Sequence, residues 1–252
     1  MNVDHPAAGQ IPGLRELWKE AFGDNDLFLD AFFAHGFSAN RCRCVTEEGR
    51  VLAALYWFDA ACEGRRIAYL YAIATAASHR GRGLFSMLLA DTKMVLEKAG
   101  YGGILLVPEN EALSRMYEKF GFTACTAVDT FSAMAGEKAV PMREIGEAEF
   151  ARLRREFLPA GAVLQEGETL AFLASQGHFW AGADFLAVGQ IYDGKLVCSE
   201  FLGNRDAASG LLRALAVPEG TFRTPGEEKP FSWFLPLQDT CGRPTYFGLA
   251  LD

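Results

Sequence analysis

The amino-acid sequence predicts an α/β protein of the α+β kind, in which helices cover a mixed sheet. Two such domains are expected in tandem. Half of its 252 residues are apolar and 22% are charged, as in an ordinary globular protein. Residues 1–135 alternate helical and strand periodicity in the order α-α-β-β-β-α-β-α-β, which is typical of a mixed sheet with helices on both faces. The remaining residues repeat a shortened version of this order, which predicts a second domain of similar architecture.

The first half opens with two helices, since apolar residues recur at helical spacing in GLRELWKEAF and in NDLFLDAFFAHGF. The periodicity then becomes that of strands. RCRCVTEEGRVLAALYWFDA predicts two strands around a Glu-Glu-Gly turn, and EGRRIAYLYAIAT predicts a third strand.

Two helix–strand pairs complete the first half. GLFSMLLADTKMVLEKAG predicts an amphipathic helix closed by Gly100, and YGGILLVPE predicts a strand buried on both faces. NEALSRMYEKFGF begins with an Asn cap and ends at Gly121, and TACTAVDTFSAM follows as a strand. AGEKAVPM has the composition of a linker, so we expect domains over residues 1–135 and 140–252.

The second half repeats this order of elements loosely. EAEFARLRREFL and GETLAFLASQG predict helices, and DFLAVGQIYDGKLVCSEFLG predicts a hairpin around Asp193–Gly194. RDAASGLLRALAV predicts a helix, and GTFRTP, KPFSWFLPL and PTYFGLALD predict strands. Residue identity between the halves is slight, so the order of elements alone supports a repeat.

Charge and composition exclude several classes of protein. A net charge of −8 disfavours a general binder of nucleic acid or of anionic membranes. The six cysteines include no C-x-x-C pair and have few histidines around them, so we expect free thiols and no metal site. The chain contains no secretory signal pattern and no run of 18 apolar residues, which predicts a cytoplasmic protein.

The segment SHRGRGLFSMLL at residues 78–89 is the strongest candidate for a binding site. A strand ends near Thr75 and a helix begins around Gly83, and a helix N-terminus favours a bound anion. Gly81 and Gly83 allow close approach of the backbone, while Arg80 and Arg82 add positive charge. The segment lacks the Lys-Ser/Thr ending of a P-loop and the G-x-G-x-x-G spacing of a Rossmann site. A glycine-rich turn with solvated arginines is the alternative interpretation.

A second motif decides between these interpretations. The combination of R-x-x-G-x with N-x-x-A-x-x-x-Y-x-x-x-G-F after the next strand resembles the GNAT superfamily of acyl-CoA N-acyltransferases. In the first motif Arg80 and Gly83 match, whereas Phe85 takes the position of a small residue. The matches to the second motif are Asn110, Ala112, Tyr117, Gly121 and Phe122. The resemblance covers residues 1–135 and implies the GNAT fold there.

The resemblance implies a definite site for acetyl-CoA, between the strands at 67–75 and 103–108. Backbone amides of residues 80–84, which are Arg80, Gly81, Arg82, Gly83 and Leu84, would hold the pyrophosphate. Main-chain groups of Ile73, Ala74 and Thr75 would hold the pantetheine and direct an N–H group at the thioester carbonyl. In this family the residue at the motif position of Asn110 often contacts the cofactor, which implies the same role for Asn110. An amine attacks the thioester directly, and Tyr117 takes the position of the acid that protonates the leaving thiolate.

Several of these roles have alternatives in the residues themselves. Tyr117 lies four residues after Leu113 and also fits a packed core aromatic, and Asn110 also fits a plain helix N-cap. Tyr69 and Tyr71 share one face of their strand and are candidates to line the acceptor pocket or to relay a proton through water. Glu109 and Glu111 are candidates for a general base, although a dedicated base is not required.

We therefore expect an N-acetyltransferase that is a monomer or homodimer and acts on a primary amine of a small molecule or peptide. The alternatives are a non-catalytic acyl-CoA sensor and a transferase of longer acyl or aminoacyl groups. The second half lacks R-x-x-G-x and the second helix motif, so we expect a degenerate GNAT-like domain that does not bind CoA; a lipid-carrier-like domain is the alternative. We expect Glu166, Glu200 and the arginines of RLRREF to be solvated; a contribution of negative charge to the acceptor site is the alternative for the two glutamates.

Overall fold

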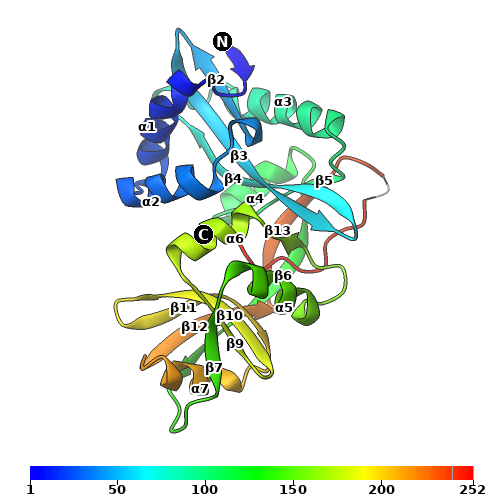
Figure 1. Cartoon of the computed structure of the whole chain (residues 1–252). Helices are drawn as coiled ribbons and strands as arrows, with labels where there is room; N and C mark the ends of the chain where they lie inside the picture. The colour runs from blue at the N-terminus through cyan, green and yellow to red at the C-terminus, as the bar shows by residue number, and fades with distance from the viewer. Residues whose placement is uncertain (240, 252) are drawn as a thin grey trace. The chain divides into compact units, whose positions relative to one another are not determined.

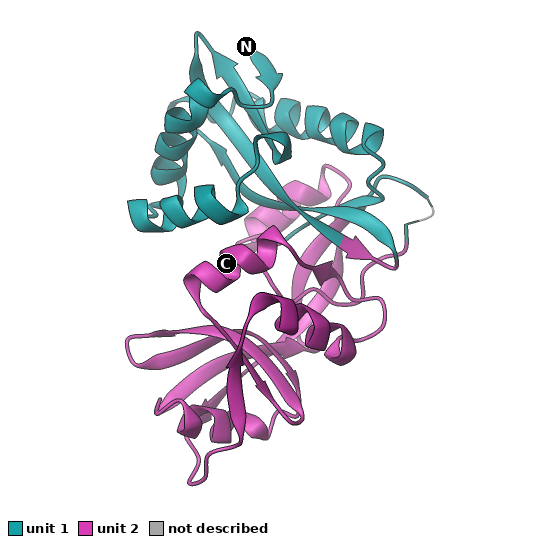
Figure 2. Cartoon of the chain, in the orientation of Figure 1, with its two compact units in different colours: residues 1–60, 64–106, 235–241 teal, residues 61–63, 107–234, 242–252 magenta. Residues whose placement is uncertain are grey.

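The structure is a computed structural model that describes residues 1–239 and 241–251. The chain forms two compact units (Figure 2). Unit 1 comprises residues 1–60, 64–106 and 235–241, and unit 2 comprises residues 61–63, 107–234 and 242–252. Unit 2 therefore includes a helix and a strand that belong to the first half of the sequence. The expected division into domains over residues 1–135 and 140–252 remains a prediction.

Unit 1 is built on a mixed sheet with the strand order β1-β2-β3-β4-β5 (Figure 1). Its strands are β1 (Asn2–Asp4), β2 (Cys42–Glu47), β3 (Arg50–Cys62), β4 (Arg65–Thr75) and β5 (Gly103–Leu106). Strand β2 pairs antiparallel with β1 and with β3, whereas β4 and β5 are parallel. Its helices are α1 (Ile11–Phe22), α2 (Asp26–Ala31) and α3 (Leu84–Lys98), with short helical turns η1 (Ala8–Gln10), η2 (Phe32–Gly36), η3 (Ala39–Arg41) and η4 (Ala77–His79).

Local chemistry explains the limits of these helices. Helix α1 buries Leu14, Leu17 and Trp18 on one stripe and ends at Gly23, whose φ of +77° is readily accessible to glycine. The side chain of Asn25 accepts a hydrogen bond from the backbone N–H of Phe28 and so caps α2. Helix α3 packs on β1, β2 and β4, and α1 packs on β4. The central strand β3 is buried continuously over residues 52–58, as expected for a strand covered on both faces.

Unit 2 has a sheet with the strand order β13-β6-β12-β11-β10-β9-β7. Its strands are β6 (Thr123–Met134), β7 (Met142–Ile145), β8 (Leu164–Gln165), β9 (His178–Gly182), β10 (Phe185–Tyr192), β11 (Lys195–Gly203), β12 (Glu219–Pro225) and β13 (Lys229–Pro236). Its helices are α4 (Glu111–Glu118), α5 (Glu147–Phe157), α6 (Glu168–Gln176) and α7 (Ala207–Ala214). Among the strands paired within the unit 2 sheet, only β11 and β12 are parallel in the described registers.

Strand β6 is the last strand of the first half of the sequence, yet its partners in unit 2 come from the C-terminal part. Residues Glu219–Pro225 of β12 pair antiparallel with Val128–Met134, and Lys229–Phe234 of β13 pair antiparallel with Thr123–Val128. This pairing explains why β6 and the preceding α4 belong to the same compact unit as the C-terminal strands.

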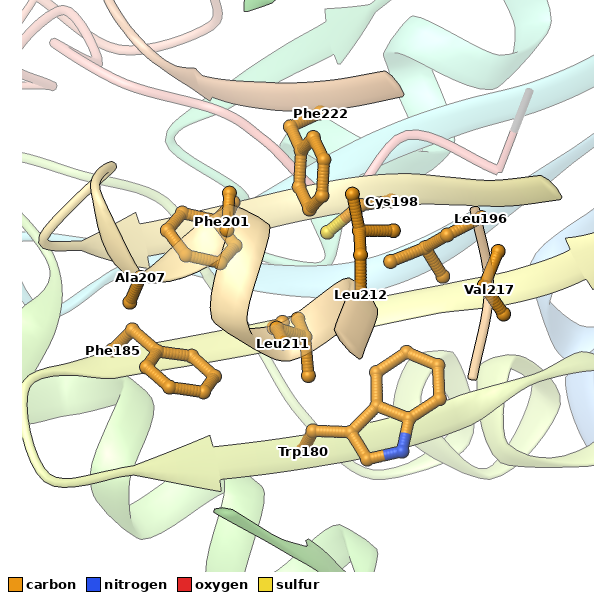
Figure 3. Packing of buried hydrophobic residues seen from close by; sticks show 12 residues of the cluster. Trp180, Phe185, Leu196, Cys198, Phe201, Ala207, Leu211, Leu212, Val217 and Phe222 are labelled. Atoms are coloured by element: carbon orange, nitrogen blue, oxygen red, sulfur yellow. The ribbon is translucent and has the colours of Figure 1, made fainter. Parts of the chain in front are cut away.

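The core of unit 2 lies between α7 and one face of its sheet (Figure 3). Aromatic rings from three strands meet there, with the Phe185 and Phe201 rings stacked at 5.5 Å between centroids and the Phe201 and Phe222 rings edge to face at 5.4 Å. Leu211 and Leu212 of α7 complete the cluster and are fully buried. Burial of apolar side chains at such density is the main stabilising term of the unit.

The strand order repeats between the two units. The order β7-β9-β10-β11-β12 matches β1-β2-β3-β4-β5, and in each case the last pair is parallel. Helix α3 connects β4 to β5, and helix α7 connects β11 to β12. The predicted mixed sheet with helices is confirmed.

Several predictions from periodicity differ from the structure. The segment predicted as a strand at residues 244–252 forms no strand within its described part, and makes an isolated bridge between Ala162 and Tyr246. Its backbone bonds a loop instead, since Val163 donates to the Tyr246 carbonyl and Thr245 to the Gly161 carbonyl. The sequence analysis also missed the short strands β1, β7, β8 and β9.

Candidate functional site

Strand β4 leaves its regular conformation just before the residues predicted to hold pantetheine. Ala72 has a φ of +48° inside the strand, whereas the other non-glycine residues with positive φ lie in turns or after a helix. A non-glycine residue in this region carries about 1 kcal/mol or more of strain, and such residues cluster at functional sites. Ile73, Ala74 and Thr75 follow this distortion. Sequence analysis missed Ala72 because its local pattern is that of any strand alanine.

The segment of residues 76–83, which we term the anion loop, is held to unit 1 by three hydrogen bonds. The Ala76 N–H group donates to the Leu52 carbonyl at 2.8 Å. The Ala77 N–H group donates to Oε1 of Glu20 at 2.7 Å. Nε of Arg80 donates to the Thr75 carbonyl at 3.2 Å. The loop is therefore fastened at its beginning and leaves its second half available for a ligand.

The second half of the anion loop presents backbone donors. In the described part of the chain, the N–H groups of Gly81, Arg82 and Gly83 have no hydrogen-bond acceptor. Gly81 and Gly83 have φ values of +75° and +76°, and a Cβ atom at either position would meet nothing within 4 Å. Gly83 immediately precedes α3 and Leu84 is the first residue of that helix. Unsatisfied N–H groups at a helix N-terminus form an anion-binding geometry.

The arginines of the anion loop are exposed. Arg82 forms no ion pair with any described residue, and the guanidinium of Arg80 is held by the Thr75 carbonyl. Phe85, the departure from the family motif, is half-buried in the first turn of α3. The arrangement supplies positive charge beside the open N–H groups.

Tyr69 and Tyr71 lie on the same side of β4, with ring centroids 6.3 Å apart. Tyr69 is only 3% exposed and stacks on Phe58, so it belongs to the core. Tyr71 is half-buried and packs against Trp18 of α1 at 5.6 Å between ring centroids. Of the two predicted substrate-binding tyrosines, Tyr71 is the more accessible.

Asn110 and Tyr117, which carry the second motif, belong to unit 2. The side chain of Asn110 accepts a hydrogen bond from the Leu113 N–H group at 3.1 Å, and so caps α4. The Tyr117 ring contacts Phe122 edge to face at 5.7 Å, and Tyr117 is 7% exposed. Burial raises the pKa of Tyr117 to about 12, which keeps its hydroxyl protonated at neutral pH.

Neither of the acidic residues at the start of α4 is distinguished as a base. Glu109 and Glu111 are exposed, and Glu111 pairs with Arg115 one turn later in the helix.

Over residues 1–239 and 241–251, no group of three or more His, Cys, Asp and Glu side chains is placed to hold a metal ion. No helix in the described part of the chain is long and apolar enough to cross a membrane.

The corresponding loop of unit 2, between β11 and α7, is occupied by its own side chains. Arg205 donates to a carboxylate oxygen of Asp129 at 2.7 Å and to the Pro225 carbonyl at 3.0 Å. The Asp206 N–H group donates to Oδ1 of Asn204 at 3.1 Å, and the amide of Asn204 donates to Asp184. The Asp206 and Ala207 N–H groups both have acceptors within this loop, in contrast to those of residues 81–83.

Two expectations about charged residues of unit 2 are wrong. Arg154, in RLRREF, and Glu200 are both buried and form an ion pair, because α5 packs over β11. The other two arginines of that segment, Arg152 and Arg155, are exposed, and Arg155 pairs with the half-buried Glu166.

Comparison with known proteins agrees with the motifs. Residues 2–125 match the family model described as "Acetyltransferase (GNAT) domain". No curated protein sequence matches significantly.

Solved structures resemble nearly the whole chain. A GCN5-related N-acetyltransferase from Kribbella flavida superposes with a TM-score of 0.70 at 17% identity, over 94% of this chain and 72% of that chain. A GCN5-related N-acetyltransferase from Anabaena variabilis gives a TM-score of 0.72 at 12% identity, over 94% and 73%. Eis1 from Mycobacterium abscessus gives 0.69 at 11% identity, over 94% and 74%. These likenesses establish a shared fold that extends beyond the matched domain.

The family match over residues 2–125 and the mixed α/β fold lead to one conclusion: residues 2–125 of this chain form a GNAT acetyltransferase domain.

Proposed function

We propose that the protein transfers an acetyl group from acetyl-CoA to a primary amine. The open N–H groups of Gly81, Arg82 and Gly83, before helix α3 and beside two exposed arginines, carry this proposal. They fit the pyrophosphate of CoA, because that group is a compact dianion and the loop offers convergent donors without any carboxylate in its sequence.

The transfer proceeds by direct attack of the amine on the thioester, without an acyl-enzyme. The amine nitrogen attacks the thioester carbon, the carbon–sulfur bond breaks, and CoA leaves as a thiolate, while the amine loses a proton to water. The main chain of Ile73, Ala74 and Thr75, beyond the distortion at Ala72, holds the pantetheine and offers an N–H group to the developing oxyanion. Holding both reactants in place supplies much of the acceleration.

Tyr117 is the acid that protonates the leaving thiolate, and the resulting tyrosinate regains a proton from water. Asn110 contributes to binding the cofactor. The motif match supports both assignments. The Tyr117 hydroxyl is protonated at neutral pH, as an acid must be, although burial raises its pKa to about 12 and makes it a weaker proton donor than an exposed tyrosine. Tyr71, with Trp18 beside it, contributes to the acceptor pocket, and Tyr69 supports Tyr71 from the core.

The C-terminal half is a degenerate GNAT-like domain that binds no CoA. The repeated strand order supports a GNAT-like half over a lipid-carrier-like domain. The internal contacts of Arg205, Asn204 and Asp206 support the loss of a cofactor site.

Two measurements test the proposal. CoA binding is followed by calorimetry, and release of the CoA thiol from acetyl-CoA is followed over a panel of small amines and amino-terminal or lysine peptides. We expect binding together with amine-dependent thiol release. Binding without release for every amine would support a non-catalytic acyl-CoA sensor, and absence of binding would overturn the proposal. Faster release from longer acyl or aminoacyl donors would identify a different acyl group.

A further inference from the structure

Glu20 of helix α1 contacts the anion loop through its carboxylate. Oε1 of Glu20 accepts the backbone N–H of Ala77 at 2.7 Å, across 57 residues of sequence. Ala77 is the first residue of the turn η4, and Arg80 follows that turn as its C-cap. Glu20 therefore fixes the turn from which the open N–H groups of residues 81–83 emerge.

The two neighbouring backbone donors of the loop are held by different elements. Ala76 donates to the Leu52 carbonyl on β3, and Ala77 donates to Glu20 on α1. The bond from Ala76 joins two backbone groups, so it does not depend on the identity of any side chain. The bond from Ala77 depends on the single side chain of Glu20. Hydrogen bonds between a carboxylate and a backbone N–H group are among the stronger ones in proteins.

Helix α1 is a rigid support for this contact. Leu17 and Trp18, in the turn before Glu20, are 4% and 2% exposed and anchor the helix in the core. The Trp18 indole N–H also donates to Asp24 at 2.8 Å. A side chain carried on a packed helix holds its partner more closely than one on a loop does.

We propose that Glu20 is a positioning residue for the anion loop, which orients the N–H groups of Gly81, Arg82 and Gly83 and thereby sets the affinity for CoA. This inference rests on the proposed function. The negative charge of Glu20 by itself opposes an anionic ligand, so its contribution comes from the hydrogen bond to Ala77. A neutral side chain that keeps an acceptor oxygen should therefore serve as well.

The test compares Glu20→Ala with Glu20→Gln in the full chain, by calorimetry with CoA and by steady-state kinetics with acetyl-CoA. Glu16→Ala is the matched control, because Glu16 is an exposed carboxylate on the same helix that forms no hydrogen bond to the described residues of the loop. Melting temperatures of all four proteins are measured in parallel.

We expect Glu20→Ala to bind CoA about five- to tenfold more weakly, the effect of losing one charge-assisted hydrogen bond. KM for acetyl-CoA should rise by a similar factor with kcat nearly unchanged, because the reacting atoms are untouched. Glu20→Gln and Glu16→Ala should bind as the wild type does. A purely structural role would move the melting temperature and would leave no such separation of KM from kcat.

The outcomes separate this inference from the proposed function. Wild-type protein that binds no CoA overturns the proposed function itself. Wild-type binding that Glu20→Ala leaves intact overturns only the positioning role. Glu20→Gln as weak as Glu20→Ala also overturns it, because the hydrogen bond would then not be the cause.

Discussion

Arg154 and Glu200 form a bidentate ion pair in the interior of unit 2. Nε of Arg154 donates to Oε2 at 2.6 Å and Nη2 donates to Oε1 at 2.9 Å, with side chains 2% and 1% exposed. The Tyr246 hydroxyl donates to the same Oε1 at 3.1 Å, and Nη1 of Arg154 donates to the Val163 carbonyl at 3.3 Å. The pair thus ties helix α5, strand β11 and the C-terminal segment together.

Removal of one partner of this ion pair should destabilise the fold strongly. Glu200→Ala leaves the Arg154 guanidinium buried without its counter-charge, and we expect a loss of about 3–5 kcal/mol in the free energy of unfolding. Urea unfolding measures the change. Glu156→Ala, which breaks the exposed pair with Arg152, is the control and should cost about 0.5 kcal/mol or less. A loss of similar size in both variants would contradict the buried role.

Gly81→Glu should abolish CoA binding. The side chain has room, so the variant adds a carboxylate at the proposed phosphate position and a strain of about 1 kcal/mol from the φ of +75°. Gly81→Ala carries the same strain without the charge and serves as the control. We expect calorimetry to show modest weakening for the alanine variant and no measurable binding for the glutamate variant. Equal affinities would place the cofactor elsewhere.

Tyr117→Phe should lower turnover with little change in CoA affinity. Loss of a positioned general acid typically costs about 10²–10⁴-fold in rate. The substitution retains the buried ring and its packing on Phe122, so the fold should persist. Tyr192→Phe, which removes a hydroxyl from a side chain 70% exposed, is the control and should leave kcat unchanged. Unchanged turnover in Tyr117→Phe would remove this residue from the mechanism.

The raised pKa of Tyr117 has a definite consequence for pH dependence. The folded state favours the neutral phenol, because burial raises the pKa of Tyr117 from 10.0, the ordinary value for a tyrosine, to about 12. The stability that this preference contributes is complete below pH of about 10 and is lost as the pH rises to about 12. Ultraviolet difference spectra of wild type against Tyr117→Phe should show no tyrosinate from this residue below pH of about 11. Ionisation near pH 10 would indicate a solvated ring.

Each chain should bind one CoA. The anion loop of unit 1 keeps open donors, whereas Arg205 and Asn204 close the corresponding loop of unit 2. Calorimetric stoichiometry measures this directly. A second equivalent of CoA that persists in Gly81→Glu would show that the C-terminal half has its own site.

Most secondary structure of this protein could be predicted from local pattern. The stripe of Leu14, Leu17 and Trp18 predicts α1, and Asn110 predicts the start of α4 through a hydrogen bond that spans three residues. The two glycines of the anion loop are equally local, because their φ values are set by the turn itself. These features depend on residues that are neighbours in the chain, so they can be predicted from the amino-acid sequence.

The sequence by itself thus determined the order of elements, the family and the position of the anion loop. Only the tertiary structure decided the positive φ of Ala72, the C-terminal partners of β6 and the contact of Glu20 with Ala77. The burial of Arg154 against Glu200 was decided in the same way. Each of these depends on a partner or a packing environment distant in sequence, and such choices depend on the free energy of the whole fold, which no local spacing of residues encodes.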